Sequence, residues 1–246
     1  MVKWLLCACL LVMSAQGQSP YLQHRRTASR PPPAAGGGGS NVTFDTSAKA
    51  GCGSSTTRTI TITVANNSNR LLIVMPSAGD GTSSDRVVSS VSSDLDGAFT
   101  HVTSGDADDN NFVRTEAWRK TAPTVGTHTI TVTYGGTVIA AEAFAISLYG
   151  VDQTTPIGTP TTASATSAAP TGAVTLGSDD MAVGGITTDS ETLSWTTGTS
   201  RQVTENCDND VSSGLATNTG TGSTSVTAST INQPYALVVL PVNGAP

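Results

Sequence analysis

Residues 58–64 read RTITITV. Ile60, Ile62 and Val64 alternate with threonines, and residues 128–134 (HTITVTY) repeat the pattern. Successive side chains of a β-strand point to opposite faces, so an alternation with a period of two predicts two half-buried strands.

Three further segments extend this pattern to the whole chain. Residues 71–75 (LLIVM) and 141–149 (AEAFAISLY) are apolar at both odd and even positions, as in central strands that are buried on both faces. The apolar segment 235–242 (YALVVLPV) is typical of a last strand that completes the sheet. We count about a dozen strand candidates between turn-forming residues, and no segment with an apolar period of 3.6. The sequence therefore predicts an all-β chain: a single antiparallel β-sandwich of jelly-roll or immunoglobulin-like type.

The first 40 residues have a different composition. Lys3 precedes an apolar run at 4–13, and this layout predicts a signal peptide over 1–17, cleaved after Gly17. The run is far shorter than the roughly 20 residues that span a bilayer, so we expect no membrane-spanning segment. A Pro/Gly-rich linker follows at 18–40; its GGGGS is either natural or engineered. We thus expect a secreted protein, extracellular or at the cell surface, with one domain at 41–246.

The cysteines fit an exported chain. Cys7 and Cys9 would leave with the signal peptide, so Cys52 and Cys207 remain. In an oxidising compartment two cysteines predict one disulfide; two free thiols are the alternative.

The charge of the domain is strongly negative. From Ser40 onward there are eight basic and eighteen acidic residues, a net charge of −10. Such a surface repels phosphates, so we expect no nucleic-acid partner.

The order of the segments is similar to that of a known module. NRLLIVMPSA (69–78), VRTEAWRKTAPTVGTHTITVTYGG (113–136), GVDQTTPIGT (150–159) and QPYALVVLPV (233–242) carry the resemblance. The chain resembles, over nearly all of 41–243, a β-sandwich module recurrent in secreted bacterial proteins and in phage structural or tail proteins. The resemblance implies a structural, display or adhesion role and brings no catalytic residue set.

The candidate ligand-binding residues centre on two tryptophans. Arg114, Glu116 and Trp118 share one face of a strand expected at 112–121, and Trp195 lies in the loop-like ETLSWTTGT. Sugar sites combine aromatic platforms with carboxylates and amides, whereas the structural alternative is that both rings cap the ends of the sandwich.

Acidic loops raise the question of calcium, which binds six to eight oxygens. The alternative is that Asp and Asn favour turns for their own local hydrogen bonds. The candidate Ca²⁺ ligands are Asp106, Asp108, Asp109, Asn110, Asp94 and Asp96. No other cofactor is predicted.

Catalytic signals are weak. The sequence lacks G-x-S-x-G and H-E-x-x-H. A glycoside hydrolase needs two carboxylates across a cleft, for which Glu116 and Glu142 are the candidates. We expect Glu142 to end at the rim of the sandwich with a basic partner, and His128 to lie on the threonine face of its strand.

We therefore expect a secreted, non-enzymatic β-sandwich module with a structural, surface-display, virion or filament role. The first alternative is a carbohydrate-binding or adhesin module supported by calcium, and the second is a glycoside hydrolase. The expected partners are an extracellular glycan or other protein subunits, including copies of the same chain as a homo-oligomer.

Overall fold

The computed structural model describes residues 40–246 except 81, 83, 111, 209 and 210. The expected signal peptide, and the linker up to residue 39, lie outside the described residues. The described chain forms sixteen β-strands and no helix, and all strand pairs are antiparallel. The all-β antiparallel sandwich is thus confirmed. No helix of the described part is long and apolar enough to cross a membrane.

The largest sheet folds over on itself along one long strand, β8 (Gly126–Tyr149). The first half of β8 pairs with β4 and with most of β2, and its second half pairs with β1, β3 and the start of β2. Two predicted strands, 128–134 and 141–149, are therefore one continuous strand. The other strands of this sheet are β1 (Thr43–Lys49), β2 (Gly53–Val64), β3 (Leu71–Gly79), β4 (Val88–Ser93), β5 (Gly97–Ala98), β6 (Thr100–Asp108) and β7 (Val113–Thr121).

Two glycines permit the fold-over. A Cβ on Gly135 would lie 2.4 Å from the carbonyl oxygen of Ser84, and one on Gly136 would lie 2.0 Å from Oδ1 of Asp85. Only glycine lets the segment before β4 cross this closely. Past the bend, the Tyr134 hydroxyl donates to the carbonyl oxygen of Glu142, so the two halves of β8 face each other.

Two smaller sheets complete the fold. The five-stranded sheet has the order β13-β14-β11-β16-β9, and the three-stranded sheet has the order β10-β15-β12. Their strands are β9 (Thr161–Ser167), β10 (Thr171–Leu176), β11 (Met181–Asp189), β12 (Ser194–Thr197), β13 (Thr199–Cys207), β14 (Val211–Thr219), β15 (Gly222–Ser229) and β16 (Gln233–Val242).

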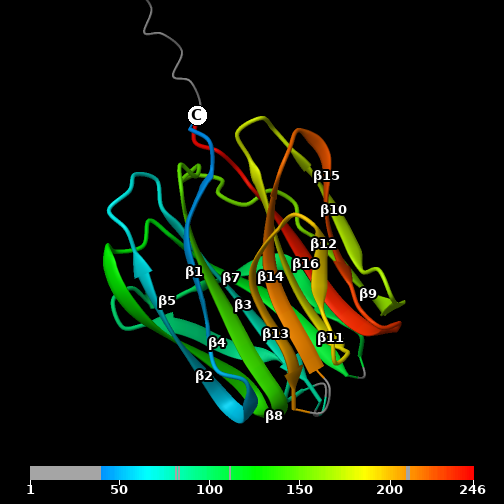
Figure 1. Cartoon of the computed structure of the whole chain (residues 1–246). Coiled ribbons are helices and arrows are strands. Elements are labelled where there is room, and N and C mark those ends of the chain that lie inside the picture. Colours follow the sequence, from blue (N-terminus) through cyan, green and yellow to red (C-terminus); the bar gives the residue numbers. More distant parts are fainter. Residues whose placement is uncertain (1–39, 81, 83, 111, 209–210) are drawn as a thin grey trace, which may run out of the picture. The chain divides into compact units, whose positions relative to one another are not determined.

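The sheets stack as four layers, which we number along the stack (Figure 1). The first layer holds β2, β4, β5 and the first half of β8, and the second holds β1, β3, β6, β7 and the second half of β8. The five-stranded and three-stranded sheets form the third and fourth layers. Within the described residues, three apolar cores separate the layers.

The burial of single strands follows from this stacking. Residues of β3 alternate between two cores: Leu71 and Ile73 face the third layer, whereas Leu72 and Val74 face the first. The outer strands keep a polar face, so Thr59 of β2 stays exposed. The expectation that 71–75 and 141–149 are central strands is confirmed, because both are buried on each face.

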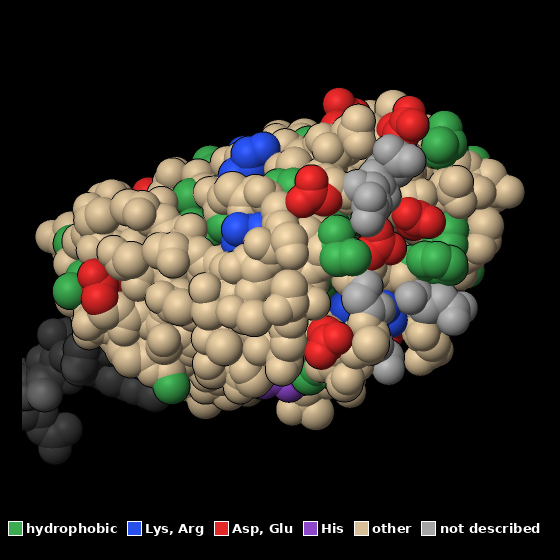
Figure 2. Space-filling model, turned by 90° about the horizontal axis from the view of Figure 1, so that it is seen from below, with side chains coloured by type: hydrophobic (Ala, Val, Ile, Leu, Met, Phe, Trp, Pro, Cys, Tyr) green, Lys and Arg blue, Asp and Glu red, His purple; other side chains and the backbone are tan. Residues whose placement is uncertain are grey.

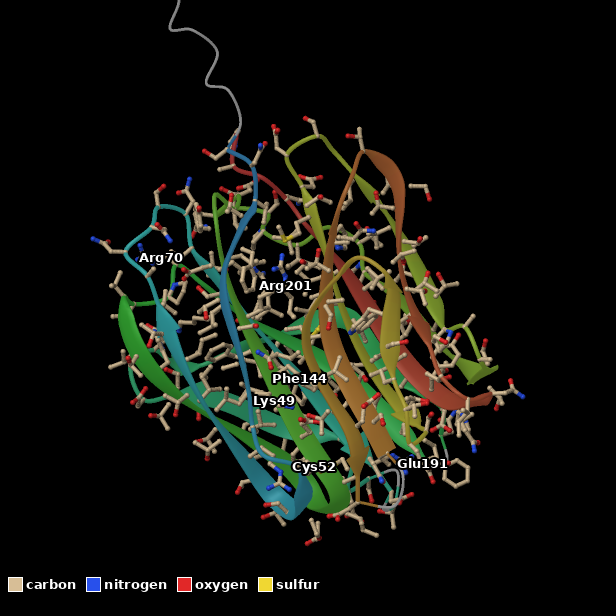
Figure 3. The ribbon with its side chains drawn as sticks, in the orientation of Figure 1. Lys49, Cys52, Arg70, Phe144, Glu191 and Arg201 are labelled. Carbon is tan, nitrogen blue, oxygen red and sulfur yellow. A yellow bond between two sulfur atoms is a disulfide. The ribbon has the colours of Figure 1, made fainter. Side chains whose placement is uncertain are left out.

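One covalent bond ties the two halves of the chain together. Cys52, in the turn before β2, forms a disulfide with Cys207 at the end of β13, with a Cα–Cα distance of 5.7 Å. Figure 3 shows Cys52 toward the lower end of the sandwich, where Glu191 also lies. The predicted disulfide is thereby confirmed.

Candidate functional site

On the described part of the chain, ion pairs link five side chains of β6 and β7 into one group, and a hydrogen bond from a tryptophan adds a sixth. We call them the β6–β7 cluster: His101, Asp106, Asp108, Arg114, Glu116 and Trp118. The strand register places them on one face of the second layer, because His101 pairs with Trp118, Asp106 with Glu116, and Asp108 with Arg114. The structure thus joins three of the predicted ligand-binding residues to two of the predicted calcium ligands.

A large bulge in β6 builds this arrangement. In a regular strand His101 and Asp106, five positions apart, would point to opposite faces. Here the four residues 102–105 stand opposite the single residue Ala117, so both side chains reach the same face. Ser104 has a φ of 60°, and a Cβ on Gly105 would lie 3.0 Å from the carbonyl oxygen of Val102, so the bulge requires this local sequence.

Arg114 is the hub of the cluster. Its Nε lies 2.6 Å from Oε1 of Glu116, its Nη1 3.0 Å from Oδ2 of Asp108, and its Nη2 3.5 Å from Oδ2 of Asp106. Burial opposes the charged form, but the hydrogen bond and attraction to Glu116 outweigh it and raise the pKa of Arg114 above its usual value. Asp108 also pairs with the buried Arg86, at 3.4 Å.

Glu116 is held from three sides and is only 3% exposed. Its Oε1 accepts the backbone N–H of Val88 at 2.9 Å as well as the Arg114 guanidinium, and its Oε2 accepts the indole N–H of Trp118 at 3.1 Å. Nε2 of His101 lies 2.6 Å from Oδ1 of Asp106 and 3.9 Å from Oε2 of Glu116. The imidazole also packs against the Trp118 ring, with 4.8 Å between centroids.

The turn between β6 and β7 lies beside the cluster. The Asp109 carboxylate accepts the backbone N–H groups of Phe112 and Val113, and Asn110 has a φ of 67°. These are local turn roles of the kind that Asp and Asn favour. With Pro234 of the third layer, these turn residues line a hollow of about 360 Å³. Figure 2 shows acidic and hydrophobic side chains gathered on this lower end of the sandwich.

Asp94 and Asp96 lie elsewhere, in the turn between β4 and β5. Asp94 accepts the backbone N–H groups of Thr129 and Leu95, and these hydrogen bonds, that from Thr129 first, lower its pKa. Asp96 accepts from Thr124, in the turn after β7, whereas Asp109 precedes β7. The full length of β7 therefore separates Asp109 from Asp96.

The two tryptophans are not brought together. Trp118 is half-buried in the second layer, and Trp195 is half-buried on β12 of the fourth layer, against its apolar core. Nε1 of Trp195 is buried and has no hydrogen-bond partner among the described residues. No common aromatic platform results.

The expectation for Glu142 is wrong. Glu142 does not end at the rim with a basic partner: it is 1% exposed, inside β8, and accepts hydrogen bonds from the Thr204 and Ser213 hydroxyls of the third layer. Burial raises the pKa of its carboxyl. Lys49 donates to Oγ1 of the same Thr204, at 2.8 Å, and Figure 3 shows this lysine on β1.

Glu116 and Glu142 lie on opposite faces of the second layer. Glu142 pairs across the sheet with Ser77, which pairs in turn with Thr115, so Glu142 shares the face of Thr115 and not that of Glu116. The two carboxylates therefore face no common cleft.

The expectation for His128 is also wrong. It shares the parity of Ile130, not of the threonines, and is fully buried, with Nδ1 2.9 Å from Oγ of Ser93 and Nε2 2.7 Å from the carbonyl oxygen of Thr124. Counting the alternation from Ile130 would have placed it correctly.

His101 and Arg86 are the site residues that sequence reasoning missed. The signal for His101 was the Ser-Gly pair at 104–105 inside a strand-like segment, since a glycine within a strand often marks a bulge. We find no comparable sequence signal for the burial of Arg86.

Comparison of the chain with protein-family models, curated proteins and solved structures finds no match. The resemblance to the secreted and phage β-sandwich module stays a prediction from sequence motifs.

Proposed function

We propose that the chain is an exported, non-enzymatic β-sandwich module with a structural or surface-display role. The observation that carries the proposal is that the two carboxylates considered for catalysis serve as hydrogen-bond acceptors inside the fold. Glu116 and Glu142, on which the hydrolase hypothesis depended, are buried, hydrogen-bonded within the fold and on opposite faces of one sheet. A retaining or inverting hydrolase needs two carboxylates on either side of one substrate.

The stacking of the sheets supports a structural role. Four layers, three apolar cores and a disulfide favour a stiff body, and the Cys52–Cys207 bond is compatible with an oxidising, extracellular setting. The resemblance to the phage and secreted module implies a role of this kind, and an N-terminal linker would hold the module away from its anchor point.

The test is immunogold labelling of intact cells or particles that make the protein, with antibodies against the folded domain. We expect label on the outer surface, and a permeabilised sample as the control should add little. Label confined to the cell interior would refute surface display. Turnover of a polysaccharide that is lost in Glu116→Gln or Glu142→Gln would refute the non-enzymatic assignment.

Glycan binding is the second candidate, and one observation favours it. Phe112 is 43% exposed at the hollow beside Asp109 and Asn110, so an aromatic face, a carboxylate and a carboxamide converge on one opening. Sugars bind by stacking on such faces while their hydroxyls pair with carboxylates and amides.

A glycan array with and without EDTA tests this second candidate. We expect binding to be lost in Phe112→Ala and kept in Leu95→Ala, a matched loss of an exposed hydrophobic side chain (47%) at the β4–β5 turn. EDTA-sensitive binding that added Ca²⁺ restores and Zn²⁺ does not would support calcium at Asp109 and Asn110. Equal binding by both variants would refute the site.

A further inference from the structure

The β6–β7 cluster contains a donor set that the structural proposal does not use. Nε2 of His101 and one carboxylate oxygen each of Asp106 and Glu116 all lie within 4.8 Å of one another. Zinc lies about 2.0–2.2 Å from each nitrogen or oxygen ligand. Small side-chain adjustments would therefore bring all three donor atoms to a single ion.

Arg114 orients these donors. The guanidinium holds Oδ2 of Asp106 and Oε1 of Glu116, so the other oxygens, Oδ1 and Oε2, are the ones nearest His101. Trp118 adds a hydrogen bond to Oε2 of Glu116. Outer groups that pin the ligands in this way are a regular feature of protein metal sites.

The charges of the surroundings also favour a cation. Asp106, Asp108 and Glu116 carry three negative charges, and Arg86 and Arg114 carry two positive ones. Together these five side chains carry one net negative charge, which a bound cation would compensate.

The site is open to ions from solvent, and its three donor residues are held on paired strands. The side chains of His101 and Asp106 are 37% and 32% exposed, so an ion can enter from solvent, whereas Glu116 is 3% exposed. All three residues lie on paired strands, and the bulge at 102–105 is what places His101 beside Asp106.

We propose that His101, Asp106 and Glu116 bind a divalent transition-metal ion of the zinc class. One imidazole with two carboxylates suits zinc better than calcium, which takes oxygen ligands alone. The site differs from the calcium ligands predicted from the acidic loop, since it uses His101 and Glu116 and excludes Asp109 and Asn110.

The alternative is that the contact between His101 and Asp106, with 2.6 Å between Nε2 and Oδ1, is only structural. That alternative predicts no zinc affinity at this position.

The experiment is calorimetric titration of ZnCl₂ into the purified full chain after chelator treatment, in wild type, His101→Ala, Asp106→Asn and Asp94→Asn. Asp94→Asn is the matched control, because it removes a carboxylate from the β4–β5 turn. We expect wild type and Asp94→Asn to bind one zinc ion per chain more than His101→Ala. Asp106→Asn should bind it at least about tenfold more weakly, since even the loss of a supporting group has that effect.

Thermal melting gives a second readout on the same proteins. Zinc should raise the Tm of wild type and Asp94→Asn, and leave that of His101→Ala unchanged. An equal zinc stoichiometry in wild type and His101→Ala would overturn the proposal, as would no binding to wild type. Calcium that displaces zinc at equal concentration would also overturn it, in favour of an all-oxygen site.

Discussion

Removal of the disulfide should cost the protein a large part of its stability. Cys52 and Cys207 are 155 residues apart in sequence. In the chain-entropy model, closing a loop of that length in the unfolded chain stabilises the fold by about 5 kcal/mol. Domains are commonly stable by only about 5–15 kcal/mol, so we expect a severe loss rather than a modest one.

Urea unfolding followed by tryptophan fluorescence measures this loss. With a slope near 3 kcal/mol/M for a chain of this size, the midpoint of Cys52→Ala/Cys207→Ala should fall by roughly 2 M. Reduced wild-type protein is the control, because it loses the bond but keeps the Cys207 sulfur packed against Ala140 and Val211. The slope should rise in both samples, since the unfolded chain without its cross-link exposes more surface.

Two results would refute this reasoning. A midpoint shift below about 0.3 M would mean that the bond constrains the unfolded chain far less than its loop length implies. Two free thiols in a titration of the unfolded, unreduced protein would mean that the bond is not formed. Agreement between the reduced protein and the double variant would assign the effect to the cross-link alone.

Three further predictions concern the contacts between layers. Because burial raises the pKa of Glu142 in the fold, its contribution to stability is full below the ordinary carboxyl pKa and is lost as the pH rises through the raised value. Glu142→Gln should flatten that decline in denaturant titrations at a series of pH values. Gly184→Ala should destabilise the fold by about 1–3 kcal/mol, because the new Cβ would lie 2.8 Å from Cγ1 of Val226. Its control, Gly51→Ala, has no atom within 4 Å of the new Cβ and should change the midpoint little. Thr115→Val should cost about 1–3 kcal/mol in the same assay, since its buried hydroxyl bridges the second and third layers, and an unchanged midpoint would contradict that bridging role.

The strands were predictable because their side chains alternate. The alternation with a period of two at 58–64 predicted that β2 is buried on one face only. The unbroken apolar run at 71–75 predicted a central strand that is buried on both faces. The fold-over of β8 was not predictable from the same pattern. The fold-over needs Gly135 and Gly136, because any side chain there would clash with Ser84 and Asp85, and that contact exists only once the sheets have formed. From the sequence alone, a pair of glycines is equally compatible with an ordinary turn between two strands.

The candidate site was predictable only in part. Arg114, Glu116 and Trp118 were placed on one face correctly, because β7 is regular over those positions. His101 was missed because alternation, applied across an unseen bulge, sends it to the face opposite Asp106. The burial of Glu142 was missed because a carboxylate inside an apolar strand is stable only with hydroxyl donors from another layer, and those donors, on β13 and β14, come late in the sequence.

The two binding hypotheses depend on different side chains and can fail separately. Phe112 lines the hollow at the β6–β7 turn, whereas His101 lies beyond the bulge, next to Trp118. His101→Ala should therefore remove zinc and leave glycan retention intact, and Phe112→Ala should do the reverse. If one variant abolished both activities, the ion and the glycan would share one site. The bulge at 102–105 would then serve to align a metal-supported binding surface, and the structural role proposed for the module would have to include recognition.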